Sequence, residues 1–241
     1  MKAQKQAGFT LVEIAIVLVI IGLLLGGILK GQEMITQAKI KNVIGDFSGI
    51  SAAFYGYQDR YRQIPGDDAC AGTGANSGMC GSTSGRWASA TTPPASGDGN
   101  GRVTGYYNST GATDESRLWW THLRLAGFVS GQGPVQPFNT YAGIIGVQTG
   151  DGGDGTQTAT IGPAMGGTAG ANGLPGLLIC SSNLPDTVAI AADTQMDDGI
   201  RTTGNLRGQL NASPTPTILA DIGTGAYAQT GTNVYSMCRA L

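Results

Sequence analysis

The residue with the clearest chemical potential in this 241-residue chain is Glu13, a carboxylate near the start of a long apolar segment. No charged residue occurs from Ile14 to Leu29. With residues 9–12 added, the segment is long enough to cross a bilayer as a helix, which takes about 20 residues. Ionisable groups at membrane depth are costly unless they are paired, so they mark functional sites. We therefore expect Glu13 to act by pairing its charge.

A second group of carboxylates lies late in the chain, at Asp193, Asp197 and Asp198. Clustered carboxylates and loop carbonyls suit Ca²⁺, which takes about six to eight oxygen ligands. The spacing is not that of an EF-hand loop. A solvated acidic turn, with Asp198 and Gly199 at its corner, is the interpretation that we favour. Calcium is the one cofactor candidate.

Four cysteines, Cys70, Cys80, Cys180 and Cys238, all lie beyond the apolar segment. An even number of cysteines outside the membrane is typical of two disulfides formed in an oxidising compartment. Three pairings are possible in principle. A Gly-rich loop joins Cys70 to Cys80 at small entropic cost, and a bond from Cys180 to Cys238 would hold a chain end that otherwise frays. We therefore favour these two pairs over a zinc site, because His122 is the single histidine.

Motifs that would indicate catalysis or nucleic-acid binding are missing from the sequence. It has no phosphate-binding loop, no Gly-x-Ser-x-Gly elbow and no His-Glu-x-x-His pair. Beyond residue 62, seven arginines face twelve acidic residues and there is no lysine. Such a charge-poor, mildly acidic region is a poor nucleic-acid binder. We expect neither an enzyme nor a nucleic-acid partner.

The nine residues from Lys5 to Glu13, Lys-Gln-Ala-Gly-Phe-Thr-Leu-Val-Glu, resemble the leader and cleavage site of type IV pilins and type II secretion pseudopilins. The resemblance is tight over roughly the first sixty residues. It implies that a prepilin peptidase cuts between Gly8 and Phe9 and that the new Phe9 amine is N-methylated. An ordinary signal peptide fits poorly, because this apolar segment is too long and has no small-residue cleavage site after it. A plain membrane anchor would not explain Glu13.

The resemblance also implies partners and a location. Glu13 would pair with the methylated amine of Phe9 in an adjacent subunit. The partners would be the prepilin peptidase and methyltransferase, copies of this chain or other pilins, and the assembly platform of the inner membrane. The precursor would wait in the cytoplasmic membrane with its head outside the cytoplasm, and the subunit would reach the cell surface in a pilus. Some pseudopilins carry a late calcium loop, which adds to the interest of Asp193, Asp197 and Asp198.

The elements that must position these residues follow from periodicity and turn signals. One helix can run from Phe9 to about Tyr61, since no proline occurs before Pro65 and apolar residues recur at three- and four-residue steps. A second helix is expected from Glu115 to about Ala126, and a short one from Leu184 to Met196. Residues 98–101, 150–155 and 197–199 are expected in turns. Strands are expected at residues 141–147, 158–161, 177–180 and 235–238.

The predicted organisation is an α+β fold in which a long N-terminal helix packs its second half on a Gly-rich, disulfide-linked head. Residues 1–8 would be the leader, 9–30 the membrane and filament-core segment, 31–62 the amphipathic segment and 63–241 the globular head. The predicted function is that of a structural subunit of a type IV pilus-like filament. A type II secretion pseudopilin and a membrane-anchored binding domain that never polymerises are the alternatives.

Overall fold

The computed structural model describes Gly8, Met165 and residues 10–74, 77–81, 84–151, 173–211 and 225–241. The chain divides into two compact units, Met1–Lys39 and Ile40–Leu241. We call the second one the head unit. After the long helix, its described part has two short helices, two strands, a further helix and two more strands, and the four strands form one sheet. The α+β class predicted from the sequence is therefore confirmed, with two disulfides.

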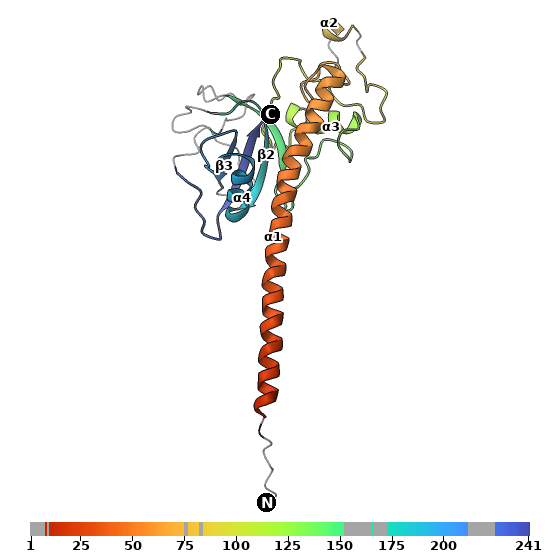
Figure 1. Cartoon of the computed structure of the whole chain (residues 1–241). Coiled ribbons are helices and arrows are strands. Elements are labelled where there is room, and N and C mark those ends of the chain that lie inside the picture. The colour runs from red at the N-terminus through yellow and green to blue at the C-terminus, as the bar shows by residue number, and fades with distance from the viewer. Residues whose placement is uncertain are drawn as a thin grey trace, which may run out of the picture. The chain divides into compact units, whose positions relative to one another are not determined.

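Helix α1 runs from Leu11 to Tyr61, the long red-to-orange coil of Figure 1. It is the one helix among the described residues that is long and apolar enough to cross a membrane, judged by length and composition. From Leu11 to Leu29 every side chain is exposed. The helix ends where Arg62 takes a left-handed φ of 56° and donates its N–H to the Gln58 carbonyl, just before the proline that the sequence pointed to.

The sheet is antiparallel throughout, with strand order β1-β2-β4-β3. Its strands are β1 (Ile145–Asp151), β2 (Pro175–Pro185), β3 (Leu206–Leu210) and β4 (Val234–Ala240). Neighbouring residues of β2 face opposite sides, as in any strand. Ile179 joins a core cluster with residues of α1, whereas Leu178 and Cys180 join a smaller cluster with Tyr107. Both faces of the sheet are thus covered.

The main core of the head unit forms where the second part of α1 meets the sheet and the shorter helices. Figure 1 shows this part of α1 beside the sheet and close to α3 (Glu115–Leu125). The buried α1 side chains recur at the spacing of one helix face: Ile40, Val43, Phe47, Ile50, Ala53, Phe54 and Tyr57. They share the core with Trp119 and Trp120 of α3 and with residues of α4 (Asp186–Met196). Helix α2 (Ser77–Cys80) is a single turn.

Two sequence predictions about strands were wrong. The strand expected at residues 141–147 begins only at Ile145, because the Asn139 side chain accepts the N–H groups of Tyr141 and Gly143 and holds them in a turn. Residues 150 and 151, expected in a hairpin tip, belong to β1. Strand β3, which begins at Leu206, was not predicted from the sequence, and its Leu206 N–H donates to Asp197. The strand predicted at residues 158–161 lies outside the described residues.

Candidate functional site

The start of α1 is held by a reciprocal pair of hydrogen bonds between Thr10 and Glu13. The Glu13 Oε2 atom accepts the Thr10 N–H and the Thr10 hydroxyl, both at 2.8 Å, and the Thr10 hydroxyl accepts the Glu13 N–H at 3.3 Å. This is the capping box that a Thr-x-x-Glu sequence can form at a helix N-terminus. This capping box was not predicted, although the spacing of the two residues in the sequence indicates it.

The capping box leaves part of the Glu13 carboxylate available. Among the described residues, no hydrogen bond or ion pair involves Oε1, while Oε2 takes both bonds from Thr10. The surrounding side chains of α1 are apolar and exposed, with Leu11 at 87% and Ile14 at 49% of full exposure. Gly8 is exposed, and Phe9 lies outside the described residues. Glu13 therefore offers one carboxylate oxygen to a cation from a neighbouring molecule on an otherwise apolar surface.

The acidic group Asp193, Asp197 and Asp198 comes together in space, with one oxygen of each carboxylate within 4.8 Å of the others. All three carboxylates already accept hydrogen bonds from protein groups. Asp193 accepts the Tyr227 hydroxyl at 2.6 Å, Asp197 accepts the Leu206 N–H at 2.8 Å, and Asp198 accepts an N–H and a hydroxyl from its own loop. These bonds account for the three carboxylates without a metal ion, so calcium binding here stays a prediction.

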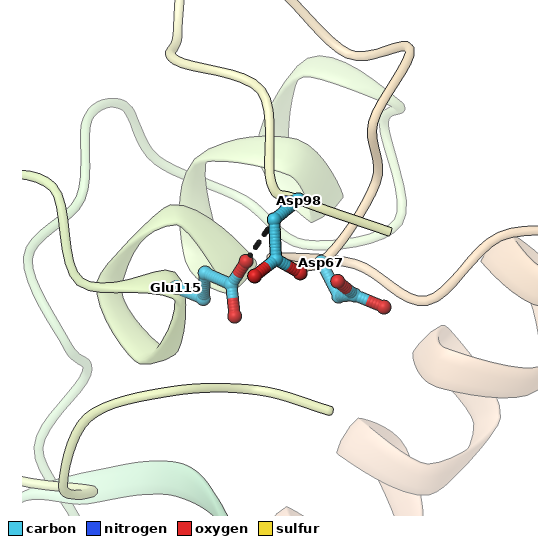
Figure 2. A group of neighbouring side chains, drawn as sticks. All are labelled: Asp67, Asp98 and Glu115. Carbon is cyan, nitrogen blue, oxygen red and sulfur yellow. Dashed lines mark hydrogen bonds between the residues drawn. The ribbon is translucent and has the colours of Figure 1, made fainter. Parts of the chain in front are cut away.

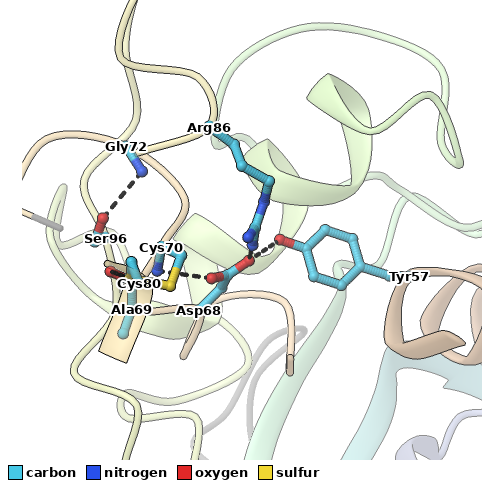
Figure 3. Close-up of a disulfide and its surroundings, with 8 residues drawn as sticks. All are labelled: Tyr57, Asp68, Ala69, Cys70, Gly72, Cys80, Arg86 and Ser96. Atoms are coloured by element: carbon cyan, nitrogen blue, oxygen red, sulfur yellow. Dashed lines mark hydrogen bonds and ion pairs between the residues drawn. A yellow bond between two sulfur atoms is a disulfide. The ribbon is translucent and has the colours of Figure 1, made fainter. Parts of the chain in front are cut away.

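The structure pairs Cys70 with Cys80 and Cys180 with Cys238, the pairing that the sequence argument favoured. Cys180 and Cys238 lie directly opposite each other in β2 and β4, and both are fully buried. The first disulfide closes a short loop next to the end of α1 (Figure 3).

Beside that loop, the fully buried Asp68 carboxylate joins the loop to α1. It accepts the Tyr57 hydroxyl and the Cys70 N–H and forms an ion pair with Arg86, as Figure 3 shows. The Arg86 guanidinium also lies 4.6 Å from the Tyr61 ring centre. A buried carboxylate needs such partners to remain charged, so this network fixes the loop on the helix. No role for Asp68 or Arg86 was predicted from the sequence.

Three further carboxylates, Asp67, Asp98 and Glu115, also meet in the head unit, where sequence reasoning had expected only a turn around Asp98. One oxygen from each lies within 4.8 Å of the others. Figure 2 shows Asp98 between Glu115 and Asp67, with its N–H donating to Glu115. Asp67 and Glu115 are 3% and 5% exposed, whereas Asp98 is exposed. The three residues belong to separate parts of the chain, and no local motif links them.

His122 serves packing and backbone hydrogen bonding. Its Nδ1 atom accepts the Gly66 N–H at 2.9 Å, and its Nε2 atom lies 3.1 Å from the Ala95 carbonyl oxygen. Burial is the main cause that lowers the pKa of His122 to about 4; the hydrogen bond to Ala95 opposes it and the positive charge of Arg86 adds to it, so the ring is neutral near pH 7. Both ring nitrogens are committed to the backbone. His122 therefore has no free nitrogen for acid–base chemistry.

Residues 3–29 match the family model of the prokaryotic N-terminal methylation motif, the prepilin-type signal of type IV pilins and pseudopilins. Neither the curated proteins nor the solved structures that we compared match the chain. The matched segment covers the predicted cleavage site, the capping box and the apolar start of α1. The family model thus confirms the prepilin-type signal at the position that was predicted from the sequence.

The long apolar helix, the antiparallel sheet with its helices, and the two disulfides fit a pilin-like fold. Together with these features, the N-terminal signal supports a precursor of the type IV pilin or pseudopilin type. The signal is of the structural pilin type, which is usually non-enzymatic. It implies processing by a peptidase and assembly with other pilins. With the apolar helix, it also fits anchoring in a membrane.

Proposed function

We propose that this protein is a structural subunit of a type IV pilus-like filament that assembles through its N-terminal helix. A prepilin peptidase cuts between Gly8 and Phe9, and the Phe9 amine is methylated. The precursor resides in the cytoplasmic membrane with residues 63–241 outside the cytoplasm, and the processed subunit enters a filament at the cell surface. The inner-membrane assembly platform and other pilins are its partners.

The observation that supports this proposal most directly is the partly unpaired carboxylate of Glu13. Its carboxylate has one oxygen without a partner among the described residues, and it lies within an apolar, exposed stretch of helix. A cation presented by a neighbouring subunit would satisfy that oxygen, and cleavage would create such a cation in the Phe9 amine. Packed apolar helices would supply the rest of the filament's cohesion.

Three variants separate the charge of Glu13 from its capping role. Glu13→Gln keeps a side chain that can close the capping box but removes the charge, and Glu13→Ala removes both. Thr10→Ala removes the hydroxyl of the box but leaves the carboxylate. We expect all three to be processed, both Glu13 variants to yield no filaments in the fraction sheared from cells, and Thr10→Ala to assemble. Normal filaments from Glu13→Gln would refute charge pairing.

The same shearing assay separates the alternatives. The prepilin-type signal is shared by pilins and pseudopilins, so it does not choose between them. Abundant sheared filaments containing the wild-type chain support the pilus subunit. Few filaments with a loss of protein secretion on deletion would indicate a type II secretion pseudopilin. Retention of all the processed chain in the membrane would indicate an anchored binding domain.

A further inference from the structure

The loop of residues 98–104 carries an exposed Asn100 directly before Gly101 and fixes its side-chain amide at both ends. Oδ1 of Asn100 accepts the Arg102 N–H at 2.8 Å, so the side chain folds back along the chain toward the Gly101 peptide group. Nδ2 donates to Asp98 Oδ2 at 2.8 Å, and Asp98 Oδ1 accepts the Asn100 N–H at 3.0 Å. The amide is therefore held in one orientation beside the next backbone nitrogen.

That backbone nitrogen, of Gly101, is hydrogen-bonded to a buried carboxylate. Its N–H donates to Asp67 Oδ2 at 2.7 Å, and Asp67 is 3% exposed. The N–H groups of Gly99 and Asn100 hold the other oxygen, Oδ1, at 2.8 and 3.0 Å. A carbonyl in this place would only hold the nitrogen, whereas a carboxylate can take its proton away. Asp67 is thus positioned as a general base for the Gly101 nitrogen.

The carboxyl groups of Asp67 and Asp98 connect this nitrogen with the far end of the Asn100 amide. One oxygen from each lies within 4.8 Å of the other, and the two groups share a hydrogen bond. Figure 2 shows Asp98 beside Asp67. Burial is the main cause that raises the pKa of Asp67 to about 6, so this carboxylate is a stronger base than usual and is still ionised at neutral pH.

We propose that this loop modifies itself: Asn100 closes a succinimide ring with Gly101 and is then hydrolysed to aspartate or isoaspartate. The Gly101 nitrogen attacks Cγ of Asn100, the new N–C bond closes a five-membered ring, and Asp67 takes the proton from the nitrogen. Negative charge develops on Oδ1, where the Arg102 N–H stabilises it. Glycine favours the attack, because it has no side chain to obstruct the approach of its nitrogen.

Ammonia is released in the second half of the reaction. The proton passes from Asp67 to Asp98, which delivers it to Nδ2 of Asn100, and the Cγ–Nδ2 bond breaks. One proton has left the Gly101 nitrogen and one has reached the leaving group, so the carboxyl groups return to their starting state. Water from the solvent then adds to one of the two ring carbonyls. Opening at one carbonyl gives aspartate, and opening at the other gives isoaspartate.

The modification changes the charge and the backbone of an exposed part of the head unit. It adds a carboxylate beside Asp98, and isoaspartate also lengthens the main chain by a methylene group. Gly101 and Val103 of the loop line a surface groove together with Phe54 and Leu177, so one wall of this groove changes as the protein ages. The reaction is irreversible and marks the time since folding. It goes beyond the proposed filament role and does not require it.

Peptide mapping of the full-length chain in detergent micelles at pH 7 tests the proposal. Mass spectrometry locates the conversion of Asn100 to the acid, and enzymatic methylation detects isoaspartate. We expect the folded chain to react at least about tenfold faster than the chain unfolded in denaturant, since a positioned acid and base typically contribute about 10²–10⁴-fold. The second Asn-Gly step, at residues 172–173, gives the reference rate in the unfolded sample.

Equal or faster modification of the unfolded chain would overturn the proposal. So would a product that contains aspartate without isoaspartate, because water would then have attacked the amide directly. Two variants address the carboxylates: Asp67→Asn keeps an acceptor oxygen for the N–H groups but removes the base, and Asp98→Ala removes the proton donor. Each should slow the folded reaction by about tenfold or more. The matched control Asp59→Asn, at an exposed carboxylate near Arg62, should leave the rate unchanged.

Unchanged rates in Asp98→Ala and in a folded Asp67→Asn would refute the carboxylate mechanism. The pH profile of the wild type gives a test that needs no variant. Asp67 must be ionised to take the proton, so the excess of the folded rate over the unfolded rate should rise as the pH increases through about 6. An excess that stays constant between pH 5 and pH 7 would overturn the role of Asp67.

Discussion

The Cys180–Cys238 disulfide should contribute more to the stability of the head unit than the Cys70–Cys80 disulfide. We compare two double variants, Cys180→Ala with Cys238→Ala and Cys70→Ala with Cys80→Ala, so that neither leaves a free thiol. The bonds join residues 58 and 10 positions apart. A longer loop restricts the unfolded chain more, because closing it removes more conformational freedom.

The magnitudes follow from these separations. In the chain-entropy model, the 58-residue loop contributes about 4.2 kcal/mol and the 10-residue loop about 2.7 kcal/mol. For a unit of this size, 1 kcal/mol changes the melting temperature by about 2–4 °C, so the two variants should differ by about 3–6 °C. The position of the longer bond acts in the same direction, because it ties the C-terminal strand β4 to β2.

Thermal unfolding of the full-length proteins in detergent, followed by circular dichroism, checks this prediction. A non-reducing peptide map of the wild type must first show the two expected pairs, since a link from Cys70 to Cys180 or Cys238 would contradict the structure. Equal losses in melting temperature, or a larger loss in the Cys70 and Cys80 variant, would refute the loop-entropy reasoning. Strain or residual structure in the reduced chain would then be the larger effect.

Gly8→Trp should block cleavage and trap a membrane-bound precursor that keeps Lys2 and Lys5, and a mature Phe9 amine found by mass spectrometry would contradict this. Arg86→Met should cost about 3–5 kcal/mol in unfolding experiments, since it leaves the buried Asp68 carboxylate without its ion pair. Adding Asp68→Asn should recover part of that loss, and full independence of the two changes would argue against the ion pair. If the group around Asp193 binds calcium, a hundredfold excess over Kd stabilises the fold by about 2.7 kcal/mol, so a chelator should lower the melting temperature. Identical melting curves would leave the acidic turn as the explanation.

The N-terminal segment could be predicted from the sequence because its determinants are contiguous. The predicted leader, the glycine at the predicted cleavage site, Glu13 and the uncharged run all lie within thirty residues, and a family model matches this segment without reference to the rest. The extent of α1 was predictable for a similar reason. Helical hydrogen bonds join residues four apart, so apolar periodicity and the first proline sufficed to place both ends.

The head unit was predicted less well, since its strands depend on partners far along the chain. The hydrogen bonds of the Asn139 side chain delay the start of β1 until Ile145, and β3 is defined by its pairing with β4. The alternation of apolar and polar residues, from which strands are predicted, reflects neither the hydrogen bonds of Asn139 nor the pairing of β3 with β4. Helices α3 and α4 were predicted nearly to the residue, because their apolar spacing and flanking turns are local.

The acidic cluster of Asp67, Asp98 and Glu115 was decided by tertiary structure alone. The sequence shows only a Pro-Gly-Asp turn, a Gly-rich loop and the start of a helix, each of which is ordinary by itself. Folding brings the three carboxylates within 4.8 Å and surrounds Asp67 with backbone N–H groups of the loop. Desolvation and like-charge repulsion depend on that distance and burial, and neither quantity is encoded in the spacing of residues along the chain.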